Sequence, residues 1–230
     1  MDEEILYFKS RYFYLLVSLI LFLLINPFLT ASHLSNFILL IFFTLIMIFS
    51  VRSVSHQILL NIITVGFACL CFLSYGYIVW IGESQVAYII HFSLTVIFLT
   101  IILLSVIVSV AKQRVITVNT LFGAICGYLL IGFTWSFIFL LIDSIDPTSF
   151  SIHIEHESIR AHIDHFIYYS YVTLTTIGYG DILALKSVAR NFSWLEAAVG
   201  QIYLAVWISQ LVGLRIVGLQ NKIAKKDGHL

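Results

Sequence analysis

Six long apolar runs constrain the fold of this chain more than any other feature of its sequence. A helix of about 20 apolar residues crosses the hydrocarbon core of a bilayer. Charged residues make up 10% of the chain, against about a quarter in soluble domains. We therefore expect an all-α membrane protein with six transmembrane helices. The expected helices are Tyr12–Thr30, Asn36–Val51, Ile58–Ile81, Val86–Ala111, Val118–Ile142 and Phe192–Val217.

The first apolar run also has one feature of a cleaved signal peptide, because the small residues Ala31 and Ser32 follow it. A signal peptide begins with positive charge, however, and this chain begins with Asp2, Glu3 and Glu4. The run is also longer than the usual apolar part of a signal peptide. We expect it to be a retained helix.

If six helices cross the membrane in alternating directions, the loops on one side contain more lysine and arginine than the loops on the other. Cytoplasmic loops of membrane proteins carry an excess of these residues. We therefore expect a multi-pass protein of the plasma (inner) membrane with both termini in the cytoplasm. The basic residues expected inside are Lys9, Arg11, Arg52, Lys112, Arg114, Arg215, Lys222, Lys225 and Lys226, and those expected outside are Arg160, Lys186 and Arg190.

Charge and motif content argue against several classes of function. The net charge of +0 offers no general attraction for nucleic acid, so we expect no such partner. The three cysteines, Cys69, Cys71 and Cys126, lie inside apolar runs and are interpreted as buried apolar residues. The sequence has no phosphate-binding loop, helical zinc motif or nucleophile elbow. We therefore expect no enzyme and no cofactor.

A short polar segment, Thr175–Asp181 with the sequence TTIGYGD, lies between an aromatic-rich helical stretch and the last apolar run. Its two glycines, Gly178 and Gly180, flank Tyr179, and glycine adopts left-handed dihedrals that other residues resist. Successive carbonyl groups of such a backbone can point toward one axis. Irregular backbone at membrane depth is tolerated where it lines a wet path. The segment therefore indicates a backbone that lines an ion path.

The segment and its surroundings resemble the potassium-channel pore family, in which such a loop forms the selectivity filter. The resemblance extends from Ala161 to Gly218 in the order pore helix, filter and inner helix. It implies a re-entrant pore helix at Ile163–Thr175 and a homotetramer, because one loop cannot surround an ion. Permeant K+ would contact the Thr176 hydroxyl and four carbonyl groups. The implied filter residues are Thr175, Thr176, Ile177, Gly178, Tyr179, Gly180 and Asp181, and the four carbonyl groups belong to Thr176, Ile177, Gly178 and Tyr179.

The resemblance also assigns roles to residues around the filter. Asp181 would tie the outer end of the filter to the pore helix, with Tyr169 as its expected partner. Tyr168 and Tyr169 would hold the pore helix against its neighbours, where the family often has tryptophan. Glu196 would support the pore helix from behind the filter. Gly200 lies where the family often has a gating hinge, although a close approach to the pore helix would explain this glycine equally well.

The chain is divided into two expected domains. Residues 112–230 form the pore domain, with outer helix, turret, pore helix, filter, inner helix and a short cytoplasmic tail. Residues 1–111 form a four-helix peripheral domain in the position of a voltage sensor. Val86–Val110, in the position of the voltage-sensing helix, contains no lysine or arginine. Because each charge supplies about 2.3 kcal/mol per 100 mV, we expect no strong voltage dependence.

The loop Asp143–Asp164 is the expected extracellular turret, and it contains four histidines in two pairs. The spacing within each pair suits a divalent metal on a helix. Histidine also titrates near neutral pH, which would allow block by protons. A solvated turret without any ligand remains the third interpretation. The histidines are His153, His156, His162 and His165.

From this sequence we expect a potassium-selective channel that conducts K+ passively, as a homotetramer in contact with membrane lipids. Lys222, Lys225 and Lys226 are placed to meet anionic headgroups. Two alternatives remain open. One is a weakly selective cation channel, and the other is a non-conducting subunit that assembles with other channel subunits and modulates them.

Overall fold

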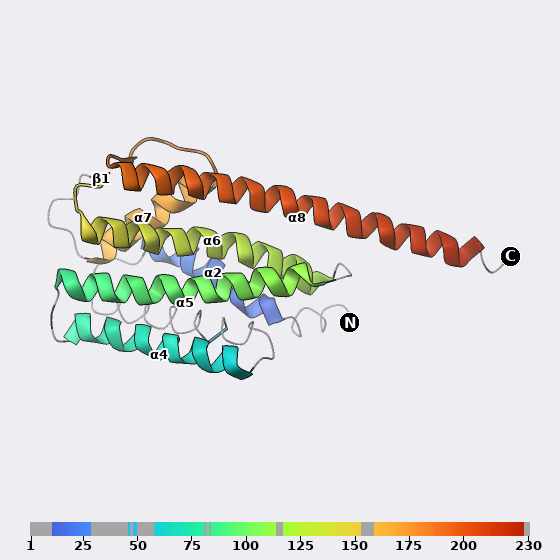
Figure 1. The fold of residues 1–230 in the computed structure, drawn as a ribbon, viewed down its shortest axis with the longest axis horizontal. Helices are drawn as coiled ribbons and strands as arrows, with labels where there is room; N and C mark the ends of the chain where they lie inside the picture. Colours follow the sequence, from blue (N-terminus) through green and yellow to red (C-terminus); the bar gives the residue numbers. More distant parts are fainter. Residues whose placement is uncertain are drawn as a thin grey trace.

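The structure, a computed structural model, describes residues 11–28, 46, 48–49, 58–80, 82, 84–113, 117–152 and 159–227. These residues are mainly helical, with one short pair of strands (Figure 1). The elements in chain order are α2 (Arg11–Ile25), the 3-10 helix η1 (Asn26–Phe28), α4 (Ile58–Trp80), α5 (Gln85–Ala111), α6 (Val118–Ile145), β1 (Phe150–Ser151), α7 (Ile159–Leu174), β2 (Leu183–Ala184) and α8 (Ser187–Asp227).

Three helices within the described residues are long and apolar enough to cross a membrane. They are Leu60–Ile78 of α4, Gln85–Ala111 and Val118–Ile145. The apolar part of α2, Tyr12–Ile25, is shorter. These helices confirm the expected all-α membrane protein, whereas the count of six transmembrane helices stays a prediction. Of the expected helix Asn36–Val51, only residues 46, 48 and 49 are described, and they are helical.

Helix α6 is the centre of the described fold, because it packs against α2, α5, α7 and α8. Small residues let its neighbours approach closely. A Cβ atom at Gly123 would lie 2.5 Å from Val110 Cγ2 of α5 and 2.9 Å from Tyr12 Cδ2 of α2. A Cβ atom at Gly132 would lie 2.8 Å from Tyr171 Cε1 of α7. These glycines therefore serve close helix packing.

The first helix is joined to the same central unit. α2 ends at Ile25 and η1 follows at Asn26–Phe28, as expected from a proline at position 27, which cannot continue helical hydrogen bonding. The Asn26 side chain donates a 2.6 Å hydrogen bond from Nδ2 to Asp164 Oδ1 of α7. This bond joins residues 138 positions apart in the chain and ties the end of α2 to the helix that precedes the TTIGYGD segment.

Helix α7 is short and lies at one end of the bundle, packed against α6 and α8 (Figure 1). It has 16 residues and begins four positions before the expected Ile163. The chain then returns toward the same end through the TTIGYGD segment and β2. The arrangement places an irregular segment directly after a helix that is too short to span a bilayer.

Helix α8 is longer than the sequence predicts. It has 41 residues, from Ser187 to Asp227, whereas Phe192–Val217 was expected from the apolar run alone. Its last residues include leucine, glutamine, lysine and alanine, which favour helix, and no proline interrupts them. The end of α8 extends past the other helices (Figure 1). The C-terminal end of α8 lies on the same side of the bundle as the connection from α5 to α6 and the start of α2 (Figure 1). β1 lies on the opposite side.

Candidate functional site

The backbone of the TTIGYGD segment alternates between two conformations. Thr176, Gly178 and Gly180 have positive φ angles of 59°, 58° and 80°, and the intervening residues do not. Glycine was expected to permit this conformation, but a β-branched residue rarely adopts it. Thr176 was therefore not predictable as a left-handed position. An alternation of this kind is what a backbone needs if successive carbonyl groups are to point toward one side.

The start of the segment is anchored to the C-terminal end of α7. Thr176 N donates to the Thr173 carbonyl oxygen at 2.9 Å, and Ile177 N donates to that of Val172 at 3.0 Å. These acceptors belong to the last turn of the helix, whose carbonyl groups lack helical partners. The same end of a helix carries partial negative charge, which favours a nearby cation.

The TTIGYGD segment presents an open face in the single chain. All seven of its residues are exposed, including the side chains of Ile177 (54%) and Tyr179 (70%). The rest of the described chain therefore leaves this face of the segment uncovered.

Aromatic side chains pack α7 against α6 and β1. The ring of Tyr169 lies 5.0 Å from that of Phe139 and 5.4 Å from that of Phe150, in edge-to-face contacts. Phe166 contacts Phe150 at 4.9 Å in the same manner. Tyr171 donates a 2.7 Å hydrogen bond to the carbonyl oxygen of Leu129. Such aromatic pairs add stability beyond that of the area they bury, so they hold α7 in its orientation.

The expected pairing of Tyr169 with Asp181 is wrong. Asp181 Oδ2 accepts a 2.6 Å hydrogen bond from the hydroxyl group of Tyr168, and Tyr169 is hydrogen-bonded to Ser193 of α8 at 2.6 Å. Successive residues of a helix point about 100° apart, so only one of the two tyrosines can face the outer end of the segment. The buried one is Tyr169. The hydrogen bond from Tyr168 holds the pKa of Asp181 below its ordinary value.

A two-stranded pair, missed by the sequence analysis, fastens the chain after Asp181. β1 and β2 are antiparallel, with Phe150 opposite Ala184 and Ser151 opposite Leu183. Leu185 N also donates to the Ser149 carbonyl oxygen at 2.8 Å. Strands of two residues carry no periodic pattern, so no sequence signal could have found them. They hold the loop after the TTIGYGD segment against the chain that precedes α7.

A buried contact joins α6, α7 and α8 behind the TTIGYGD segment. Ser170 of α7 donates a 2.6 Å hydrogen bond to the Gly132 carbonyl oxygen of α6. Its Oγ atom is also within hydrogen-bonding distance of Glu196 Oε1 of α8. Ser170, Glu196 and Gly132 are all buried. Glu196 therefore lies against the pore-helix candidate in a buried contact between α6, α7 and α8.

Residues 115–214 match a family model described as an ion channel. This part of the chain is similar to an ion-channel domain, and it is called the ion-channel domain below. The match begins just before α6 and ends within α8, so it contains α7 and the TTIGYGD segment. It supports the resemblance to the potassium-channel pore family. No curated protein and no solved structure matches the chain. Residues 1–114 lie outside the family match.

Within the ion-channel domain, Gly200 of α8 lies against the end of α7. A Cβ atom there would be 2.8 Å from the Leu174 carbonyl oxygen and 2.7 Å from Leu174 Cδ1. Close approach therefore accounts for this glycine, while its role as a hinge stays a prediction. Leu204 and Ile208 on the following turns are exposed in the single chain.

The turret histidines are only partly described. His162 Nε2 lies 2.6 Å from Asp143 Oδ2, a carboxylate of α6 that is largely buried. His165 belongs to the same helix, α7. His153 and His156 lie outside the described residues. Among the residues that the structure describes, no three histidine, cysteine or acidic side chains gather as a metal site would require. A divalent metal or proton site at the turret stays a prediction.

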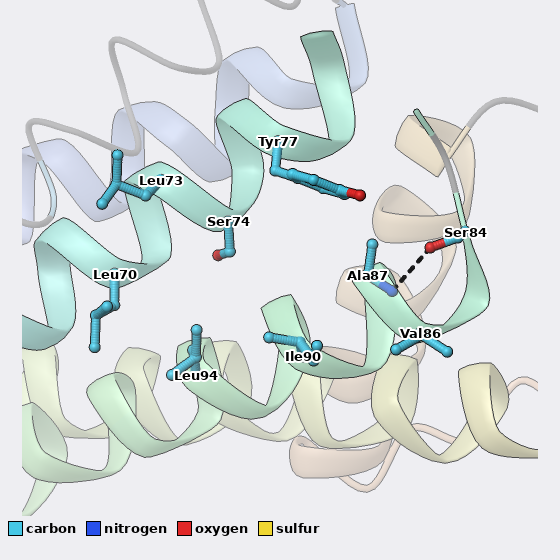
Figure 2. Close-up of a pocket in the computed structure, with 9 residues that line it drawn as sticks. All are labelled: Leu70, Leu73, Ser74, Tyr77, Ser84, Val86, Ala87, Ile90 and Leu94. Carbon is cyan, nitrogen blue, oxygen red and sulfur yellow. Dashed lines mark hydrogen bonds between the residues drawn. The ribbon is translucent and has the colours of Figure 1, made fainter. Parts of the chain in front are cut away.

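An apolar groove of about 410 Å³ lies between α4 and α5, outside the ion-channel domain (Figure 2). Most of its lining is aliphatic. At one end Ser84 caps α5 by accepting a 3.2 Å hydrogen bond from Ala87 N. An apolar surface between two membrane helices is typical of a face toward lipid, so the groove does not add to the candidate conduction site. It is lined by Leu70, Leu73, Ser74, Tyr77, Ser84, Val86, Ala87, Ile90 and Leu94.

Proposed function

We propose that four copies of this chain form a potassium-selective channel that conducts K+ passively across the plasma (inner) membrane, with both termini in the cytoplasm. The proposal builds on the ion-channel domain of residues 115–214. It adds the permeant ion, the filter, the assembly and the orientation to the broader assignment.

One observation carries the proposal: positive φ angles at alternate residues of the TTIGYGD segment, at Thr176, Gly178 and Gly180. This alternation is the backbone that a ladder of inward carbonyl groups needs. Carbonyl oxygens in such a ladder replace the hydration shell of K+, and adjacent sites let ions repel one another onward. The ion contacts are the Thr176 hydroxyl and the carbonyl groups of Thr176, Ile177, Gly178 and Tyr179.

The assembly follows from the open face. A single chain contains one TTIGYGD segment, and a ring of carbonyl groups requires several copies around an axis. The apolar exposure of α8 supports this assembly, because Ile202 is 62% exposed and Ile208 is 60% exposed in the single chain. In a tetramer, different faces of α8 contact neighbouring chains, the conduction path and lipid.

Weak voltage dependence is part of the proposal. α5 runs for 27 residues from Gln85 to Ala111 and contains no lysine or arginine. Its buried positions include His91, Thr95 and aliphatic side chains, which pack against its neighbours. Because gating charge supplies about 2.3 kcal/mol per charge per 100 mV, a helix without charge offers no steep response.

The test is ion flux from purified protein in liposomes, with K+ or Na+ as the only permeant cation and external Ba²⁺ as a blocker. We expect K+ flux that Ba²⁺ blocks and much smaller Na+ flux. Planar-bilayer recordings of the same protein should show open probability that changes little between positive and negative potentials. The Tyr179→Ala variant is the matched control, since it removes a filter side chain and should abolish selectivity or current.

The alternatives predict different results in the same assay. Comparable K+ and Na+ flux would identify a weakly selective cation channel and overturn the selectivity proposed here. Absence of flux from an intact tetramer, together with co-purification with other channel subunits, would identify a non-conducting modulatory subunit. Selective flux from Tyr179→Ala equal to that of the parent chain would overturn the filter assignment.

A further inference from the structure

The contact among Gly132, Ser170 and Glu196 contains too few hydrogen atoms for an ionised glutamate. The Oγ atom of Ser170 faces two acceptors, the Gly132 carbonyl oxygen at 2.6 Å and Glu196 Oε1 at still shorter distance. A serine hydroxyl group has one hydrogen atom to donate. If Glu196 is a carboxylate, both neighbours of Ser170 Oγ are acceptors, and they must share that one hydrogen atom.

A protonated Glu196 removes the shortage. The acid then donates from Oε1 to Ser170 Oγ, and Ser170 donates its own hydrogen atom to the Gly132 carbonyl oxygen. Every close oxygen pair in this chain of contacts has one donor and one acceptor.

The surroundings of Glu196 favour the neutral form independently. Its side chain is 0% exposed, and Oε2 has no hydrogen-bond partner among the described residues. No lysine, arginine or histidine of the described chain forms an ion pair with it. An unpaired buried carboxylate is far more costly than an unpaired carbonyl oxygen of a neutral acid.

We propose that Glu196 is a neutral carboxylic acid that donates a hydrogen bond to Ser170 and thereby positions the pore-helix candidate α7 between α6 and α8. Glu196 is a positioning residue, because it reaches the TTIGYGD segment through Ser170 and α7. This inference deepens the proposed function and rests on it for the role of α7, but the protonation of Glu196 does not depend on conduction.

Removal of the proton would place a negative charge in this contact. The titratable groups that feel this charge are the phenols of Tyr128 on α6 and of Tyr169 and Tyr171 on α7. None of them is a cation that could balance it. Alkaline pH should therefore loosen the packing of α7 against its neighbours and reduce K+ flux. A return to neutral pH should restore the packing and the flux.

Infrared spectroscopy of the purified full chain tests the proton directly. We expect the carbonyl stretch of a protonated carboxylic acid at neutral pH, and loss of that band in Glu196→Gln. In Ser170→Ala the band should remain and shift, because the acid keeps its proton but loses its acceptor. Spectra of the parent chain and Glu196→Gln that are identical in this region would overturn the proposal, whether or not the protein conducts.

Flux across a range of pH tests the positioning role. Glu196→Gln keeps a donor toward Ser170 without a titratable proton, so it should retain K+ flux and lose the alkaline inhibition. Glu196→Ala lacks the donor and should lose flux at every pH. Equal alkaline inhibition in the parent chain and Glu196→Gln would overturn this role, and so would flux in the parent chain that persists after the acid band has disappeared. Absence of flux with the acid band present would count against the proposed function and leave the proton assignment standing.

Discussion

Thr176, Gly178 and Gly180 share a left-handed backbone conformation although only two of them are glycine. The conformation costs a residue with a side chain roughly 1–2 kcal/mol, and Thr176 bears this cost at the position where its hydroxyl group is proposed to meet the ion. Strain of this kind persists where the surroundings enforce it. Here the hydrogen bond from Thr176 N to the last turn of α7 contributes to that enforcement.

Substitution of Gly178 by alanine tests the backbone itself. A Cβ atom at Gly178 meets nothing within 4 Å, so the expected damage comes from its φ angle of 58° and not from a clash. We expect a cost of about 1–2 kcal/mol per chain and loss of the preference for K+ over Na+ in liposome flux. Gly213→Ala is the matched control, because Gly213 is also free of neighbours but lies inside α8. Equal selectivity in Gly178→Ala and the parent chain would contradict the filter assignment.

Tyr168 and Tyr169 are adjacent tyrosines with different tasks, and single hydroxyl deletions separate them. Tyr168→Phe removes the 2.6 Å hydrogen bond to Asp181, so the outer end of the TTIGYGD segment should be held less firmly. We expect shorter open times in planar-bilayer recordings. Tyr169→Phe removes a bond to Ser193 and should leave open times closer to those of the parent chain.

The hydrogen bond between Tyr168 and Asp181 also predicts how the stability of the TTIGYGD segment changes with pH. Because it lowers the pKa of Asp181, its contribution should be present above the ordinary titration range of aspartate and lost as the pH falls through the lowered value. Tyr168→Phe should therefore remove this step from the acid dependence of the open time. Identical open times and acid dependence in Tyr168→Phe and the parent chain would show that the bond does not hold the segment.

At the scale of elements, α7 and α8 meet where Leu174 ends one helix and Gly200 faces it from the other. Gly200→Ala would bring a Cβ atom to 2.8 Å from the Leu174 carbonyl oxygen, and backbone cannot move aside as a side chain can. We expect a destabilisation of about 1–3 kcal/mol, the usual cost of overpacking. Thermal unfolding of the assembled protein in detergent measures it, with Gly213→Ala as control. Unchanged stability with altered gating would indicate a hinge and contradict the packing explanation.

The elements also show how far sequence reasoning extends. The apolar runs predicted α4, α5 and α6 closely, because length and hydrophobicity decide which helices can span a bilayer. For α8 they predicted a shorter helix than the structure has, because a helix continues past its apolar part when good helix formers follow. The β1–β2 pair was not predicted. Two residues per strand are held by backbone hydrogen bonds and by the contacts of Phe150, which depend on the folded surroundings.

The candidate site was predictable in its residues but not in its contacts. The TTIGYGD segment stands out in the sequence because glycine alternates with larger residues between apolar helices. The choice of Tyr168 over Tyr169 as the partner of Asp181 depends on the rotation of α7 about its axis. The aromatic cluster with Phe139 and Phe150 sets that rotation. No local pattern carries this information, because the cluster joins three separate elements.

At the scale of the whole molecule, the single chain is incomplete as an ion path. Its TTIGYGD segment is exposed along its full length, and many described side chains of α8 are exposed although α6, α7 and β2 contact the helix. We therefore expect native mass spectrometry of the detergent-solubilised protein to find four chains in one particle. Gly178→Ala should assemble in the same way, because its Cβ atom clashes with nothing within its own chain, even though its selectivity is lost. Monomers or dimers at every protein concentration would contradict the tetramer, and loss of the tetramer in Gly178→Ala alone would show that the segment itself holds the four chains together.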